Sequence, residues 1–191
     1  MTALCLRYTD FIYLSENELL EILKQRNSDY VRRFMDNDRI ISVEDHLIFC
    51  RSLSTRPNLK YFYVTLNHEP FGIVDFKAET PDWSSAVGGK YTFGDQNLPM
   101  EKVYTTALLW LMEQVGLKTV HAHVKNDNLK ALLPVYLKPT PGMRIIKKDE
   151  HYIYHETTLE HEPIRAYVAR FIQSHDLTIY FNQERWDVAR T

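Results

Sequence analysis

The sequence is poor in cysteine and glycine, and its charges nearly cancel. Its two cysteines, Cys5 and Cys50, lie in apolar surroundings and lack the spacing of metal ligands. We therefore expect both to be buried, reduced thiols of a cytoplasmic protein. The formal net charge of −2 provides no electrostatic basis for binding DNA or RNA, so no nucleic-acid partner is expected.

Long hydrophobic runs are missing as well. The N-terminal segment MTALCLRYTDFIYL is neither a signal peptide nor long enough to span a membrane, so no membrane association is expected. The chain has no internal repeat and no low-complexity stretch. What it does have is 191 residues, 45% of them hydrophobic and 25% charged, which suits one soluble domain with a continuous core.

Strand and helix patterns alternate in the order of an α/β domain with a mixed sheet. Ser15 with Glu18, and Ser42 with Asp45, are typical of capped helix starts. Gly88-Gly89 interrupts one strand, where a bulge would be natural. The expected strands are 4–8, 59–66, 71–77, 87–93, 119–124, 144–148, 152–157 and 177–181. Two expected helices cover 29–35 and 100–115. Four more are expected to begin at or near residues 15, 42, 126 and 163.

A series of short motifs runs from the end of the first helix into the second hairpin strand. It consists of Arg26-Asn27, Val31-Arg32, Phe34-Met35, Ile41-Ser42-x-Glu44-x-His46, Phe49, Tyr61-Phe62-x-Val64 and Phe71-Gly72-Ile73. With these motifs, residues 3–158 resemble the GNAT N-acetyltransferases, whose mixed central sheet has two splayed parallel strands and is flanked by helices. The likeness is greatest to the branch that acetylates nucleotide-linked amino sugars, as in pseudaminic acid (flagellin glycan) biosynthesis.

The resemblance implies a catalytic domain in residues 1–160. Residues 161–191 would form a helix-strand extension that packs either on this domain or on a partner subunit, the latter giving a homodimer. The resemblance also implies acetyl-CoA as the co-substrate. Its pantetheine arm would lie between strands 87–93 and 119–124, and its pyrophosphate would lie at the N-terminus of helix 100–115, where free N–H groups favour anions.

Six residues are expected to contact acetyl-CoA on this basis: Tyr91, Thr92, Phe93, Gln96, Asn97 and Asn128. Asn128 could equally be only a helix cap. A backbone N–H near residues 90–92 would stabilise the oxyanion of the reaction.

The loop before helix 100–115 departs from the family pattern. The family has an Arg or Gln, two free positions, a Gly, another free position, and a Gly or Ala. Here Gln96 is present, but no glycine follows it, and Asp95 and Glu101 bring negative charge to the expected phosphate site. A side chain in place of glycine limits the approach of the backbone to a ligand. A GNAT-fold module with impaired CoA binding therefore stays an alternative.

The resemblance also implies catalytic residues. Tyr136 would protonate the departing thiolate, although eight positions separate it from Asn128 instead of seven. Glu44 and His46 are candidates for the general base because the first helices cover the acceptor side in this family. Asp75 and Tyr91 are weaker candidates. Tyr136 could instead be a core tyrosine, and His46 a histidine with a structural role.

The acceptor is expected to be a small-molecule amine, namely a nucleotide-linked amino sugar, bound by Arg26, Asn27, Arg32 and Met35. A peptide N-terminus, a lysine or an antibiotic is the alternative acceptor, and Arg32 could equally belong to the solvated surface. His121 and His123 share one face of a strand, but no further ligand stands at a suitable spacing, so no metal site is expected.

Overall fold

The computed structural model describes residues 4–137 and 139–188. Within these residues, nine strands form one mixed sheet in the order β6-β7-β5-β4-β3-β2-β1-β8-β9. The strands are β1 (Leu4–Asp10), β2 (Leu59–Leu66), β3 (Glu69–Ala78), β4 (Ser85–Thr92), β5 (Thr119–Lys125), β6 (Met143–Lys148), β7 (Tyr152–Thr158), β8 (Leu177–Phe181) and β9 (Glu184–Trp186). The mixed α/β architecture expected from the sequence is therefore confirmed.

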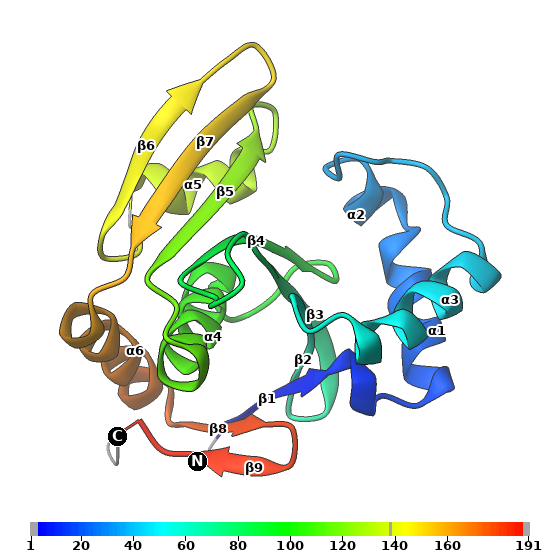
Figure 1. Cartoon of the computed structure of the whole chain (residues 1–191), viewed down its shortest axis with the longest axis horizontal. Helices are drawn as coiled ribbons and strands as arrows, with labels where there is room; N and C mark the ends of the chain where they lie inside the picture. Colours follow the sequence, from blue (N-terminus) through cyan, green and yellow to red (C-terminus); the bar gives the residue numbers. More distant parts are fainter. Residues whose placement is uncertain (1–3, 138, 189–191) are drawn as a thin grey trace.

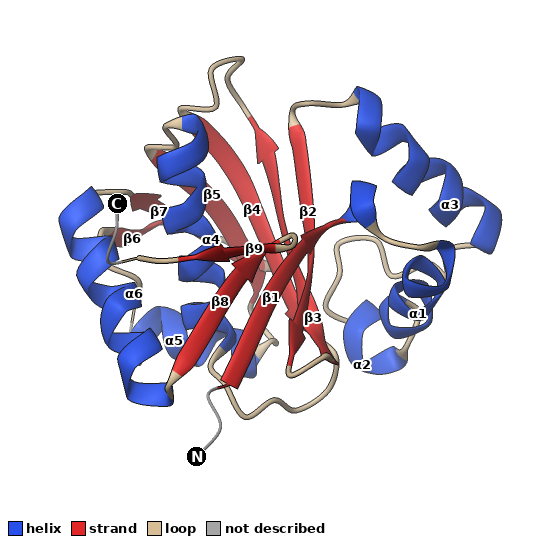
Figure 2. Ribbon diagram, turned by 90° about the horizontal axis from the view of Figure 1, so that it is seen from below, coloured by secondary structure: helices blue, strands red, loops and turns tan. Residues whose placement is uncertain are grey.

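Helices cover both faces of the sheet (Figures 1 and 2). One face carries α1 (Glu16–Arg26), α2 (Asp29–Arg32) and α3 (Val43–Ser52), and the other carries α4 (Met100–Val115), α5 (Leu129–Leu137) and α6 (His161–His175). In the described residues, none of these helices is long and apolar enough to cross a membrane.

The helix ends follow the local signals in most places. Ser15 and Glu18 form a complete capping box, and the Ser42 side chain accepts the N–H of Asp45. Gly116 ends α4 in the left-handed conformation, with φ of 74°. The helix expected over residues 29–35 is shorter, because α2 ends at Arg32.

Each face of the sheet has its own core. The larger core lies under α4 and α6 and includes fully buried Tyr8, Phe62 and Leu108. The smaller core lies under α1 and α3 and includes Ile22 and Cys50. Burial raises the pKa of the Cys50 thiol to about 11, so this thiol is protonated. Cys50 is buried as expected, whereas Cys5, on the partly exposed strand β1, is only half-buried.

The C-terminal extension is part of the larger core. Strand β8 pairs in parallel with β1, and the side chains of Ile164 and Val168 in α6 are buried in that core. The Phe181 ring stacks on Tyr8 at 4.5 Å and on Trp110 at 4.6 Å between ring centres. The extension described in the structure thus completes both the sheet and its packing, while residues 189–191 of the expected extension lie outside the described residues.

Two neighbouring parallel strands, β4 and β5, separate after a short paired stretch (Figure 1). Only three residue pairs join them, from Ser85 with Thr119 to Val87 with His121. Beyond this point β4 stays paired with β3, and β5 stays paired with β7. The splay expected for strands 87–93 and 119–124 is therefore present.

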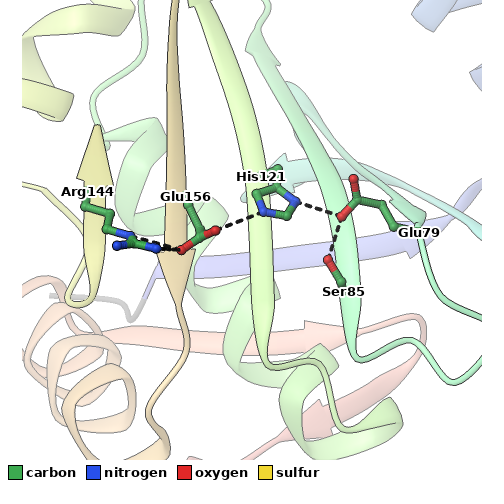
Figure 3. Close-up of polar contacts among 5 residues, drawn as sticks. All are labelled: Glu79, Ser85, His121, Arg144 and Glu156. Carbon is green, nitrogen blue, oxygen red and sulfur yellow. Dashed lines mark hydrogen bonds and ion pairs between the residues drawn. The ribbon is translucent and has the colours of Figure 1, made fainter. Parts of the chain in front are cut away.

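A row of polar side chains crosses the sheet at the level where β4 and β5 part (Figure 3). The His121 ring lies between two carboxylates, with Nδ1 2.7 Å from Glu79 and Nε2 3.1 Å from Glu156. Ser85 donates to Glu79 at 2.5 Å, and Arg144 donates to Glu156 at 2.8 and 3.0 Å. Burial alone would lower the pKa of His121, but the two carboxylates outweigh it and raise the pKa.

This raised pKa predicts a pH-dependent contribution to stability. The charged His121 ring stabilises the folded state fully below its unfolded pKa of 6.5, and this contribution is lost as pH rises through the higher folded pKa. Between pH 6 and 8, the wild type should therefore lose free energy of unfolding that the His121→Gln variant does not lose. Urea denaturation of both proteins across this range measures the difference, and parallel pH profiles would contradict it.

Candidate active site

A cleft of about 940 Å³ opens where β4 and β5 part. It passes between the strands, because residues from both faces of the sheet line it. Asp75 and Tyr91 line it on the face that carries α1 to α3, while Lys90 and Tyr104 line it on the face that carries α4. The splay of the two strands therefore connects the two sides of the molecule.

The edges of the two strands present backbone polar groups to this cleft. The N–H of Phe93 donates to the carbonyl of Phe71 on β3 at 3.0 Å. Because backbone groups alternate in direction along a strand, those of Lys90 and Thr92 face away from β3, toward the gap. By the same alternation His123 of β5 turns its backbone groups away from β7 and into the gap. An extended ligand with amide groups could pair with both edges.

Two adjacent glycines in β4 leave room for side chains that pack over this strand. A Cβ atom on Gly88 would lie 1.8 Å from the Tyr104 hydroxyl oxygen, and one on Gly89 would lie 2.7 and 2.9 Å from the Asp75 carboxylate oxygens. The pairing of β3 with β4 runs through both glycines without a register shift. The expected bulge is therefore wrong, because close side-chain packing accounts for both glycines.

The charged groups on the α4 side of the cleft are paired. Lys90 forms an ion pair with buried Glu101, and Thr140 donates to the same carboxylate at 2.6 Å. Burial would raise the pKa of Glu101, but Lys90 and Thr140 outweigh it, so the pKa lies below its usual value. Burial, assisted by the charge of Lys90, lowers the pKa of His155 to about 4, which leaves that ring neutral.

The glycine-poor loop before α4 is joined to two helices. Asp95 accepts a hydrogen bond from Lys130 of α5 at 2.5 Å, and Lys130 also donates to the Tyr30 hydroxyl of α2 at 2.8 Å. That hydroxyl donates to the carbonyl of Gly94 at 3.0 Å. Asp95 is therefore matched by a lysine, as Glu101 is, which offsets the negative charge that the sequence places beside the expected phosphate site.

The structure brings most of the expected cofactor-binding residues to the cleft. The ones that line it are Tyr91, Thr92, Gln96, Asn97 and Asn128. Phe93 instead packs in the smaller core, against the rings of Tyr63 and Tyr91. Asn128 also accepts the N–H of Ala131 at 3.2 Å, so it caps α5 as well as lining the cleft.

Of the expected acceptor-binding residues, Met35 lines the cleft. The Asn27 side chain is occupied by both backbone polar groups of Ile41, at 2.8 and 2.9 Å. Arg26 donates to the carbonyl of Asn37 at 2.6 Å, and Arg32 forms an ion pair with its neighbour Asp29. These three polar side chains hold the loop between α2 and α3 and do not line the cleft.

None of the three expected catalytic side chains lines the cleft. Glu44 is exposed in the first turn of α3. His46 is buried, with Nε2 2.9 Å from the Leu19 carbonyl, and burial lowers its pKa. Tyr136 is 53% exposed. At about 100° per residue, eight positions turn Tyr136 about 80° away from the side of α5 that holds Asn128, whereas seven would nearly restore it.

The structure also brings residues to the cleft that the sequence did not indicate. The side chains of Lys90 and Tyr104 lie there, and so do those of Tyr30 and Lys130, which are 100 positions apart in the chain. Asp75, expected only as a weaker base candidate, has a central place. The available sequence signal was a carboxylate inside an otherwise apolar strand. Within the described residues, no cluster of histidine, cysteine and acidic side chains is arranged to hold a metal ion.

Comparison with known proteins identifies relatives in sequence and in fold. No family model matches the chain. Acetyltransferase PseH of Campylobacter jejuni is 30% identical over 127 residues, which are 66% of this chain and 79% of that protein. The crystal structure of Campylobacter jejuni N-acetyltransferase PseH in complex with acetyl coenzyme A matches with a TM-score of 0.61 and 22% identity, over 81% of this chain and 99% of that chain.

A second solved structure has the same fold at lower identity. Spermidine N-acetyltransferase from Vibrio cholerae, in complex with CoA and spermine, matches with a TM-score of 0.67 and 14% identity, over 82% of this chain and 95% of that chain. At these identities the structural matches show the fold, which is the one expected from the sequence.

The packing of Tyr104 over Gly88 predicts the cost of closing that space. Gly88→Ala should lower the free energy of unfolding by about 1–3 kcal/mol, because the added methyl group collides with the Tyr104 hydroxyl. Tyr104→Phe removes a buried hydroxyl that has no hydrogen-bond partner in the described part of the chain. This change should cost little by itself and should recover part of the loss in the double variant. Equal costs of Gly88→Ala in both backgrounds, measured by urea denaturation, would contradict this packing.

Proposed function

The chain belongs to the GNAT acetyltransferase family, and on that premise we propose that it transfers an acetyl group from acetyl-CoA to the amino group of a nucleotide-linked amino sugar. The observation that carries the proposal is the cleft between β4 and β5, which is open to both faces of the sheet. One face would receive the acetyl donor and the other the amine. The two substrates would then meet at the strand edges.

The gap between the strands suits the pantetheine arm of acetyl-CoA, which carries two amide groups. The free backbone groups of Lys90, Thr92 and His123 are positioned to pair with such an arm, as the edges of a sheet pair with an added strand. An N–H on the edge of β4 would also hold the carbonyl oxygen of the thioester and stabilise the negative charge that develops there. The thioester supplies the activated acetyl group.

The phosphate end of acetyl-CoA would lie at the loop before α4. Gln96 and Asn97 line the cleft there, and the first turn of the 16-residue helix α4 lies next to them. Lys130 supplies a positive charge on the opposite wall and needs only to move from Asp95 to a phosphate oxygen. In this arrangement the lysine compensates for the glycines that the loop lacks.

The acceptor side of the cleft is the face that carries α1 to α3, and its lining favours a nucleotide-linked substrate over a simple polyamine. Its lining includes the aromatic rings of Phe34 and Tyr152, which can stack on a base. It also includes the positive side chains of Arg33, Lys77 and Lys125, which match a diphosphate better than a polycation.

Binding of acetyl-CoA can be tested separately from the acceptor. Acetyl-CoA should raise the melting temperature of the wild type, since a ligand that binds the native state stabilises it. Lys130→Ala should weaken binding of acetyl-CoA by about fivefold, the effect of about 1 kcal/mol at an exposed charge. Binding of S-acetylpantetheine, which lacks the phosphates, should not change. Lys24→Ala, an exposed lysine of α1 outside the cleft, is the matched control.

If saturating acetyl-CoA leaves the melting temperature of the wild type unchanged, the enzyme proposal fails, and the fold serves as a module without CoA binding. A Lys130→Ala variant that binds both ligands as the wild type does would remove that lysine from the phosphate site.

The acceptor can be identified by incubating the enzyme and acetyl-CoA with UDP- and dTDP-linked amino sugars, the free amino sugars, spermidine, an aminoglycoside and a peptide with a free N-terminus. Mass spectrometry should detect acetylation of a nucleotide-linked sugar in preference to its free sugar. Lys77→Ala should raise the KM for the nucleotide-linked form about tenfold and leave the free sugar unaffected, because only the former carries the diphosphate. Preferential acetylation of another amine in the panel would replace this acceptor assignment.

A further inference from the structure

Asp75 is a carboxylate in the wall of the cleft, on the acceptor side. It lies on β3, in register with Tyr61 of β2 and Gly89 of β4. Its neighbours in the chain, Val74 and Phe76, are fully buried in the larger core on the opposite face. Its own side chain is half-buried and lines the cleft. Partial burial of a carboxylate in a strand costs free energy of desolvation, and an apolar side chain at this position would avoid that cost.

In the described part of the chain, no hydrogen bond or ion pair engages the Asp75 carboxylate. The contrast with Glu101, on the other side of the same cleft, is direct, because Glu101 is held by Lys90 and Thr140. A carboxylate with a structural role has partners of that kind. Asp75 keeps its oxygens available to a ligand in the cleft.

The Asp75 carboxylate lies directly over β4, beside the strand edge. Its oxygens occupy the space where a side chain on Gly89 would begin. The residues on either side of Gly89 are Gly88 and Lys90, whose backbone groups face the gap. A carbonyl group held at this edge would therefore have the carboxylate next to it, on the face from which the acceptor enters.

We propose that Asp75 is the general base that removes a proton from the ammonium group of the acceptor. The inference depends on the proposed function, since it requires an amine acceptor and a thioester donor. The proton passes from the ammonium nitrogen to a carboxylate oxygen of Asp75, directly or through one water molecule. The freed electron pair of the nitrogen forms the new C–N bond to the carbonyl carbon, and the C–S bond breaks.

The proton balance of the reaction then closes. The sulfur leaves as a thiolate and takes up, through solvent, the second proton that the acylated nitrogen gives off. Asp75 returns its own proton to water after the products leave. Over one cycle an ammonium and a thioester become an amide, a thiol and one released proton.

The groups around Asp75 suit this role. Tyr61 of β2 and Tyr91 of β4 lie on the same face of the sheet as Asp75, and Tyr104 of α4 lies across β4 on the opposite face. Burial raises the pKa of each of these hydroxyls, so all three are neutral. The half-buried Arg26 of α1, the neutral thiol of Cys50 in α3 and Lys77 on the same strand are the other titratable groups nearby. Burial raises the pKa of Asp75 to about 6, so the carboxylate is ionised at neutral pH. A general base works best when its pKa lies close to the pH of the reaction, and this pKa meets that condition.

The test measures the pH profile of kcat/KM for the best acceptor in the panel above, with wild type, Asp75→Asn and Asp75→Glu. The wild type should lose activity below about pH 6, as Asp75 becomes protonated. Asp75→Asn should lower kcat/KM by about 10²–10⁴-fold and remove that acid limb, while its affinity for acetyl-CoA stays unchanged. Asp75→Glu should retain the limb at reduced rate, because the carboxylate is kept but displaced.

Two controls separate a base from a merely structural residue. With hydroxylamine as acceptor, which is already uncharged near neutral pH, Asp75→Asn should lose far less activity than with the ammonium substrate. Glu162→Gln, which removes an exposed carboxylate of α6 outside the cleft, should leave the pH profile unchanged.

The outcomes separate this inference from the proposed function. An active wild type whose Asp75→Asn variant keeps the acid limb, or loses equal activity with both kinds of acceptor, overturns the role of Asp75 alone. A wild type that acetylates no amine in the panel, hydroxylamine included, overturns the proposed function and the role of Asp75 together.

Discussion

The arrangement of the site depends on one constraint: β4 and β5 pair over only three residues and then separate. Where two neighbouring strands separate, the backbone N–H and C=O groups on their facing edges lose their hydrogen-bond partners. Here those groups line a cleft, where a ligand with amides of its own can satisfy them. Both strands remain fixed on their outer sides by β3 and β7, so the gap is held open by the sheet itself. The His121 row holds the strands together at the level where the opening begins.

Charge is distributed unequally around this opening. On the α4 side and along the loop before α4, acids are matched by lysines, as in the pairs Lys90 with Glu101 and Asp95 with Lys130. The exposed second pair contributes little to stability, so a competing anion can replace Asp95 at low cost. On the acceptor side, Asp75 has no such partner among residues 4–137 and 139–188. The cleft therefore presents compensated charge where a donor's phosphates would bind and a carboxylate open to a ligand where an amine would arrive.

The C-terminal residues support this arrangement from a distance. Helix α6 packs on α4, and β8 extends the sheet beside β1. The stacked rings of Tyr8, Phe181 and Trp110 join the extension to α4 and to the first strand. Because α4 contributes Tyr104 and Glu101 to the cleft, the packing of α6 helps to fix the position of those groups. The extension thus contributes to the site without lining it.

The sequence by itself determined the order of the elements, because capping residues and strand alternation are local signals. Its motifs carried the resemblance to the GNAT family, and that resemblance implied the splayed strands. It also identified Gln96 and Asn128 as cleft residues through motif position. It named Asp75 only as a weaker candidate and could not show that His46 is buried outside the cleft, since both positions depend on which side chains meet across strands and helices. The tertiary structure decided where these side chains lie, because burial, pairing of charges and access to the cleft arise only when distant parts of the chain pack together.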